Sequence, residues 1–167
     1  QIREGVGKSG AWITDFHTRF DLAEAVRLCA LLEPFAPLEI EDPVRSENKA
    51  VLRSLRSQVR VPIAVGEHFG DRWDQNDLIE SHTIDYTRVT LPNSGGITEF
   101  MKIAGLCETH YVGMIPHATG PIALAALVHA LVQHAHLAAA DTAQHIAHAV
   151  GVAHVHMFVV WRRPAGR

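Results

Sequence analysis

Apolar and polar positions follow two alternating patterns along this chain. Short apolar runs rich in β-branched residues are each followed by a longer stretch in which apolar residues recur at helical spacing. The short runs predict strands at residues 11–16, 38–41, 61–65, 84–89 and 111–115. The longer stretches predict helices at residues 21–32, 47–59, 73–80, 95–108 and from residue 121 onward.

A regular alternation of strand and helix is typical of right-handed parallel β–α–β units. Five units fit either an open doubly wound sheet or part of a (β/α)8 barrel. No G-x-G-x-x-G follows the first predicted strand, and the 167 residues are fewer than the roughly 250 of a complete barrel. We therefore predict an α/β fold in which residues 1–136 form a partial (β/α)8 TIM-type barrel of about five βα units. Residues 137–167, rich in histidine and alanine, are interpreted as an atypical C-terminal tail.

Composition narrows the classes of function. The chain is 47% hydrophobic and 20% charged, which is typical of a folded globular protein. A formal net charge of −3 and the absence of a basic stripe argue against nucleic acid as a partner. The longest apolar run, residues 121–132, is well short of the ~20 residues that span a membrane, so no membrane association is expected.

The two cysteines bear on the cellular compartment. Cys29 and Cys107 lie in separate predicted helices, so they do not form a disulfide framework, and no secretory leader begins the chain. We therefore expect a cytoplasmic protein. Because a five-unit barrel leaves two strand edges unpaired, we also expect the chain to associate with copies of itself as a homo-oligomer.

Three acidic residues stand at the carboxyl ends of three successive predicted strands. The spacing from Asp15 to Glu41 and from Glu41 to Glu67 is the same, 26 residues. A single carboxylate after a strand is more often a helix cap or a surface charge. In a parallel barrel, however, the strand ends converge on one face, where such carboxylates repel one another unless a cation lies between them. An all-oxygen set suits Mg²⁺, so we predict that these three acids bind it.

Two histidines are candidates for acid–base chemistry beside these acids. His17 follows Asp15 by two residues, so its side chain is expected on the same side of an extended strand. His117 follows the fifth predicted strand and is expected to reach the same rim from across the barrel. Histidine is the usual acid–base group near neutral pH, although either residue taken alone, without the three acids, is better explained as a hydrogen-bonded loop histidine. We predict that one takes a proton from a metal-held substrate while the other gives one.

Five motifs, taken in order along the chain, resemble the enolase superfamily. They are D-F-H-T-R at residues 15–19, I-E-D-P at 40–43, G-E-H at 66–68, G-G-I-T at 95–98, and P-H through G-P at 116–121. Within that superfamily they are similar to the mandelate racemase/muconate lactonizing enzyme branch, and closest to galactonate and mannonate dehydratases. The resemblance covers roughly residues 11–133 and implies part of the C-terminal barrel domain of such an enzyme.

The resemblance also implies an activity, that of a Mg²⁺-dependent acid-sugar dehydratase, which is a carbon–oxygen lyase. Family members bind Mg²⁺ through the acids that correspond to Asp15, Glu41 and Glu67. His17 corresponds to the acid that helps hydroxide leave. His117 corresponds to the base that removes the proton beside the substrate carboxylate, and the product is a 2-keto-3-deoxy acid.

Arg19 and His68 are candidates for binding the small sugar-acid substrate. Arg19 is placed to contact a substrate carboxylate, although an exposed arginine at a strand end is an equal interpretation. His68 stands where the family often has an arginine after the Gly-Glu pair, and it either touches the substrate or only fills the rim.

One position departs from the galactonate dehydratase pattern. Members of that group often place an aspartate after the sixth barrel strand to orient the catalytic histidine, and Thr90 stands at that position here. Asp85, five residues earlier, begins the strand and is not expected to reach the same rim. Mannonate-type members also lack this aspartate, so dehydration stays the first prediction. The alternatives are a racemase or epimerase of the same superfamily and a catalytically inactive barrel fragment.

Overall fold

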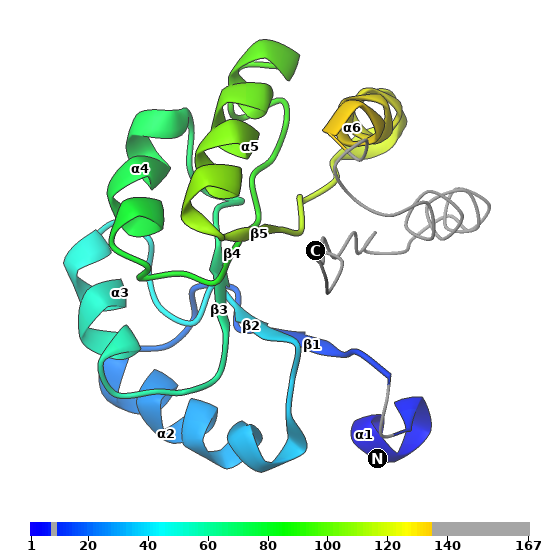
Figure 1. Cartoon of the computed structure of the whole chain (residues 1–167). Coiled ribbons are helices and arrows are strands. Elements are labelled where there is room, and N and C mark those ends of the chain that lie inside the picture. Colours follow the sequence, from blue (N-terminus) through cyan, green and yellow to red (C-terminus); the bar gives the residue numbers. More distant parts are fainter. Residues whose placement is uncertain (8–9, 135–167) are drawn as a thin grey trace, which may run out of the picture.

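The computed structural model describes residues 1–7 and 10–134, which form a layer of parallel strands covered by helices (Figure 1). The strands are β1 (Ile13–Asp15), β2 (Glu39–Glu41), β3 (Ile63–Val65), β4 (Tyr86–Thr87) and β5 (Gly113–Met114). All neighbouring strands are parallel, and their order in the sheet is β1-β2-β3-β4-β5. This unbroken sequential order is that of a barrel, since the strand order of a doubly wound sheet reverses at a switch point.

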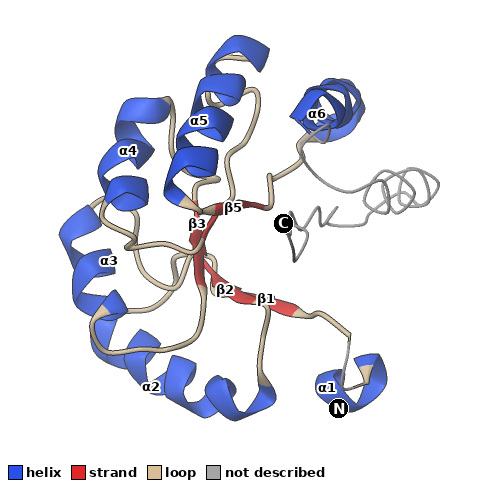
Figure 2. Cartoon of the chain, viewed as in Figure 1, coloured by secondary structure: helices blue, strands red, loops and turns tan. Residues whose placement is uncertain are grey.

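Helices follow the strands and cover one face of the sheet. Figure 2 shows an arc around the outside of the strands made of α2 (Leu22–Leu32), α3 (Lys49–Arg56), α4 (Arg72–Glu80) and α5 (Ile97–His110). After β5, α6 (Gly120–His134) contacts α5. Two short elements were not predicted from the sequence pattern: α1 (Ile2–Val6) before β1, and the 3-10 helix η1 (Glu33–Phe35) after α2.

Polar residues at the helix N-termini fix where several outer helices begin. Asn48 Oδ1 accepts a hydrogen bond from the Ala50 N–H at 3.1 Å at the start of α3. Asp71 Oδ1 accepts one from the Trp73 N–H at 3.0 Å at the start of α4. Each bond satisfies a backbone donor that has no partner within its helix, so the short polar side chain determines the helix start.

The hydrophobic core fills the space between the sheet and its covering helices. On the sheet side, Ile40 and Ile63 are paired in register and have no exposed surface. On the helix side, Ile103 of α5 is equally buried and belongs to the same apolar cluster. Since side chains alternate along a strand, Glu39 and Glu41 on either side of Ile40 point to the opposite face of the sheet.

The predicted fold class is confirmed, with shorter strands than the sequence pattern indicated. All five predicted strands are present, but the hydrogen-bonded ladder includes only two or three residues of each. Among the described residues, no helix is both long and apolar enough to cross a lipid bilayer. The predicted tail, residues 137–167, lies outside the part of the chain that the structure describes.

We expect Ile103→Ala to lower the free energy of unfolding by about 2–5 kcal/mol, because it leaves a cavity beside a fully buried position. Ile122→Ala in α6 is the matched control, since Ile122 is 87% exposed and its loss should change stability by less than about 0.5 kcal/mol. Urea unfolding followed by circular dichroism measures both values. Equal losses in the two variants would contradict the assignment of Ile103 to the core.

Candidate active site

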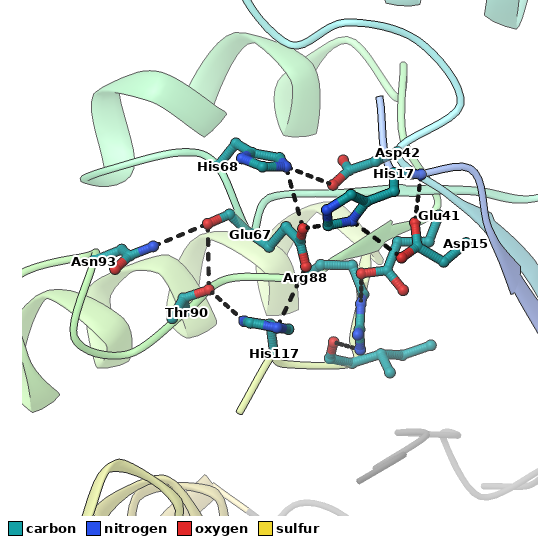
Figure 3. Close-up of polar contacts among 11 residues, drawn as sticks. Asp15, His17, Glu41, Asp42, Glu67, His68, Arg88, Thr90, Asn93 and His117 are labelled. Carbon is teal, nitrogen blue, oxygen red and sulfur yellow. Dashed lines mark hydrogen bonds and ion pairs between the residues drawn. The ribbon is translucent and has the colours of Figure 1, made fainter. Parts of the chain in front are cut away.

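The carboxyl ends of β1, β2 and β3 bring acidic side chains to one rim of the sheet (Figure 3). Asp15 ends β1, Glu41 ends β2, and the two are paired in register. Glu67 follows β3 by two residues, after Gly66, whose φ of 143° takes the backbone out of the strand. A Cβ at Gly66 would lie 3.0 Å from the backbone nitrogen of Arg88, so only glycine fits without displacing β4. The equal spacing along the sequence thus becomes a shared position in space.

Three buried carboxylates form the centre of this rim. One oxygen each of Glu41, Asp42 and Glu67 lies within 4.8 Å of the other two, and these residues are 2%, 1% and 9% exposed. The Asp42 Oδ2 atom is buried and has no hydrogen-bond partner among the described residues. Like charges so close together repel unless a cation lies among them. An all-oxygen set with an unsatisfied carboxylate oxygen fits a hard divalent ion such as Mg²⁺.

Burial and mutual repulsion make three acids of this region, Glu39, Glu41 and Asp42, hard to ionise. Burial, reinforced by the charges of Glu67 and Glu41, raises the pKa of Asp42 to about 8. On the same strand, burial and the charge of Glu41 raise the pKa of Glu39 to about 8. The pKa of Glu41 is also raised, because burial outweighs the effect of the neighbouring Arg88. A bound cation would reverse this balance by favouring the charged carboxylates.

His17 lies between Asp15 and Glu67. Its Nδ1 atom is 3.3 Å from Asp15 Oδ2 and 3.3 Å from Glu67 Oε1. Its φ of 47° shows that the chain turns at this residue, so His17 reaches Asp15 from a turn and not from the extended strand used to predict its position. The turn is held by the backbone N–H of His17, which donates to Asp15 Oδ1 at 2.6 Å. As a result, an imidazole contacts both Asp15 and one of the three buried carboxylates.

The two candidates for substrate binding occupy different places. His68 joins the acidic rim, with Nε2 at 3.1 Å from Glu67 Oε1 and 3.8 Å from Asp42 Oδ2. Its ring also lies edge-on to that of His17, with the ring centroids 5.8 Å apart. Arg19 is exposed, and within the described residues its side chain makes no hydrogen bond or ion pair. The structure therefore brings His68 to the rim and, among the described residues, shows no side-chain contact between Arg19 and the rim.

His117 reaches the rim from the segment after β5. Its Nε2 atom is 3.4 Å from Glu67 Oε2, and its Nδ1 atom is 3.1 Å from the Thr90 hydroxyl oxygen. The backbones of Thr90 and His117 also form an isolated parallel bridge. The Thr90 hydroxyl in turn donates to the backbone oxygen of Glu67 at 3.3 Å. Asp85 lies away from this contact, since its carboxylate pairs with Arg56 at 2.7 Å.

Arg88 and Asp42 are two members of the site to which the sequence analysis gave no role. Arg88 is 1% exposed, and its Nε atom donates to Glu41 Oε1 at 2.7 Å. The available signal for Arg88 was an arginine near the carboxyl end of a predicted strand, directly before the apolar Val89. For Asp42, the signal was its place directly after Glu41 in the I-E-D-P motif.

The buried Glu67 carboxylate is therefore contacted by imidazoles on both of its oxygens, by His68 as well as by the two candidate acid–base residues. His17 contacts Oε1 of Glu67 and His117 contacts Oε2, as Figure 3 shows. A substrate held beside these acids through a cation would have a proton donor and a proton acceptor within reach. The fold and these residues together define a β/α-barrel protein with a candidate metal and acid–base site at the carboxyl ends of its strands.

Comparison with known proteins assigns the chain to a family. Residues 1–163 match the family described as enolase C-terminal domain-like. The chain therefore belongs to this family, in agreement with the superfamily that the motifs resemble.

Solved structures with the same fold include two that contain Mg and a sugar acid. An enolase from Pantoea ananatis with bound D-gluconate and Mg is 35% identical, with a TM-score of 0.72, over 77% of this chain and 32% of that one. L-Talarate dehydratase from a Polaromonas species, complexed with Mg and L-glucarate, is 32% identical, with a TM-score of 0.66, over 71% and 33%. A mandelate racemase/muconate lactonizing enzyme-like protein from a Roseovarius species is 32% identical, with a TM-score of 0.74, over 77% and 33%. The chain thus spans about a third of the length of the structures that it matches.

We expect Glu39→Gln to change how stability depends on pH. Because the pKa of Glu39 is raised from 4.5 to about 8, the folded state retains a proton that the unfolded state releases between these values. Stability therefore falls as the pH rises through this window, by on the order of 3 kcal/mol at pH 7 for this one group. In thermal unfolding with EDTA, the melting temperature of the variant should rise relative to that of the unmodified chain from about pH 5 to about pH 8.

Glu80→Gln is the control for this measurement, since Glu80 is an exposed residue at the end of α4. Its unfolding curve should follow that of the unmodified chain at every pH. If Glu39→Gln also follows that curve, the buried carboxylate does not carry the pH dependence.

Proposed function

We propose that this chain carries the metal and acid–base centre of a Mg²⁺-dependent acid-sugar dehydratase. The observation that carries the proposal is the contact of His17 and His117 with opposite oxygens of the buried Glu67 carboxylate. Family membership supports it, as do the two similar structures that contain Mg with D-gluconate or L-glucarate. In this proposal a small sugar acid loses water and becomes a 2-keto-3-deoxy acid.

Asp15, Glu41 and Glu67 hold the Mg²⁺ ion in this proposal, with the unsatisfied Asp42 oxygen beside them. Bound there, Mg²⁺ supplies positive charge next to the substrate carboxylate and makes the neighbouring proton easier to remove. The imidazole of His17 now contacts Asp15 and Glu67, two of the three carboxylates that the ion needs. An ion held by these carboxylates would take the place of the His17 contacts, and the ring would then be available to the substrate.

His117 acts as the base and accepts the proton from C2 of the sugar acid. Its Nδ1 atom faces the Thr90 hydroxyl, while its Nε2 atom faces the acidic rim. When Nδ1 carries the ring hydrogen and donates to Thr90, Nε2 bears the lone pair that takes the proton. Thr90 completes the chain by donating to the backbone oxygen of Glu67. A neutral threonine therefore selects the tautomer that an aspartate selects in galactonate-type sites.

His17 acts as the acid on the other side of the substrate. In its protonated form it transfers a proton to the C3 hydroxyl as the C3–O bond breaks, so that water leaves. The electron pair of the former C2–H bond becomes the C2–C3 double bond, and the resulting enol tautomerises to the 2-keto-3-deoxy acid. Each histidine thus ends the turnover in the protonation state opposite to its starting state, and solvent exchange restores both.

A racemase or epimerase is the second candidate, supported by the likeness to the mandelate racemase-like protein. Such an enzyme shares the removal of the C2 proton but returns a proton to C2 without eliminating water. The dehydratase is preferred because the two similar structures that contain Mg also contain D-gluconate or L-glucarate, which carry several hydroxyl groups. With such a substrate, a second acid–base group can protonate a hydroxyl as it leaves.

The first test is a screen of the chain against aldonic and uronic acids, with D-gluconate among them. We expect a 2-keto-3-deoxy acid to form with Mg²⁺ and not with EDTA, as detected by a colour reaction for such products. Glu67→Gln should abolish the product, because it removes a carboxylate shared by the ion and both histidines. Glu80→Gln, on the exposed end of α4, should retain full activity. No product from the unmodified chain with any acid would contradict the dehydratase proposal and favour an inactive fragment.

A second test separates the two histidines by isotope exchange in D₂O. His17→Asn should lower the dehydration rate by about 10²–10⁴-fold while the C2 proton still exchanges with solvent, since the base remains. His117→Asn should lose both exchange and dehydration. Proton NMR follows both processes in one sample. Inversion at C2 without keto acid from the unmodified chain would instead identify the racemase or epimerase.

A further inference from the structure

Arg88 makes an unusual set of contacts in the interior of the sheet. It is the one lysine or arginine in the described part of the chain that is fully buried, with 1% exposure. Its Nε atom donates to Glu41 Oε1 at 2.7 Å, and its Nη1 atom donates to the backbone oxygen of Ile115 at 2.6 Å. Its own backbone oxygen accepts a hydrogen bond from the His117 N–H at 3.4 Å. One residue thus contacts a proposed metal ligand and both ends of the segment that leads to the proposed base.

The contacts of Arg88 connect strands that do not touch each other. Glu41 ends β2, whereas Ile115 follows β5, and β3 and β4 lie between them in the sheet. The planar guanidinium group has donors in a fixed fork, so it can bond a carboxylate and a carbonyl at once with a set geometry. The position of the Glu41 carboxylate is therefore linked to the position of the chain two residues before His117.

Stability alone does not account for such a buried ion pair. The side chains of Arg88 and Glu41 are 2% and 3% exposed, so both charges have been removed from water. Well-packed apolar side chains in place of such a pair often give equal or greater stability. The pair therefore needs a role other than holding the fold together.

We propose that Arg88 is a positioning residue, which holds the Glu41 carboxylate in place for the cation and couples it to the strand end that carries His117. The proposal rests on the proposed function, because it takes Glu41 as a ligand of Mg²⁺. The bond from Arg88 to Oε1 fixes the orientation of the carboxylate that would hold the ion. Residues that bond a metal ligand in this way typically change metal affinity by 10–100-fold when they are replaced.

Charge and position predict opposite effects of removing Arg88, which makes the proposal testable. If Arg88 acted only through its charge, its removal would relieve repulsion and Mg²⁺ would bind more tightly. If Arg88 positions Glu41, its removal leaves the carboxylate without this hydrogen bond and Mg²⁺ binds more weakly. The sign of the change in affinity therefore distinguishes the two roles.

Arg56 offers a matched control. Its Nη1 atom donates to Asp85 Oδ2 at 2.7 Å, and its Nη2 atom donates to the Val59 backbone oxygen at 2.6 Å. It thus makes the same pair of contacts, a carboxylate and a carbonyl, away from the acidic rim. Replacement of Arg56 tests for a general loss of stability without a change at the site.

The experiment is isothermal titration calorimetry of the full chain with Mg²⁺ alone. We expect Arg88→Met to weaken binding by about 10–100-fold, and Arg56→Met to leave it unchanged. Arg88→Lys keeps the charge and adds a second variant in case Arg88→Met does not fold. A single ammonium group cannot hold both Glu41 and Ile115, so this variant should also bind Mg²⁺ more weakly than the unmodified chain. Circular dichroism establishes that each variant is folded.

A second readout does not depend on the metal. In two-dimensional NMR spectra without Mg²⁺, both Arg88 variants should shift the imidazole signals of His117, whereas Arg56→Met should not. Binding by either folded Arg88 variant that equals or exceeds that of the unmodified chain would overturn the positioning role. If the unmodified chain itself binds no Mg²⁺, the metal site of the proposed function is wrong and this inference falls with it.

Discussion

Repulsion among buried carboxylates is the constraint on which the rest of this structure depends. Parallel strands present the same end to the same rim, so a fold that gathers Asp15, Glu41, Asp42 and Glu67 there also concentrates one sign of charge. Side chains that carry or can accept a positive charge lie around these acids. Imidazoles and the Arg88 guanidinium contact the acids. These groups neutralise the acids only in part, which is the physical reason for proposing a divalent cation at this rim.

Much of the fold could be predicted because its signals are local. Apolar runs of a few residues, separated by helical spacing, specify strand and helix without knowledge of distant contacts. The same pattern gives the sequential sheet, since each βα unit places its strand next to the one before it. The exact strand ends could not be predicted, because apolar residues beside a strand pack into the same core as the strand itself. The helix α1 lacks any buried residue, and so it leaves no apolar pattern to detect.

The acids at the strand ends could be predicted for a related reason, since equal spacing along a parallel barrel becomes a shared rim. The partners of those acids could not. The bond from Arg88 to Glu41 joins residues 47 positions apart, and no periodicity specifies which side chains meet across the sheet interior. The turn at His17 depends on a positive φ and on a hydrogen bond to Asp15, neither of which a strand pattern contains. The strands and helices can thus be predicted from local sequence, while the polar contacts of the site depend on the tertiary structure.

The alternation of Glu39, Ile40 and Glu41 in β2 has a consequence for how the sheet assembles. A shift of this strand by one residue would turn both carboxylates into the apolar layer beneath the helices and expose Ile40 to the acidic rim. In that layer Glu41 would lose its bond to Arg88, at a cost of several kcal/mol, so a misaligned sheet is less stable than the native one. The Glu41 carboxylate of the site therefore also favours the native register of β2 during folding.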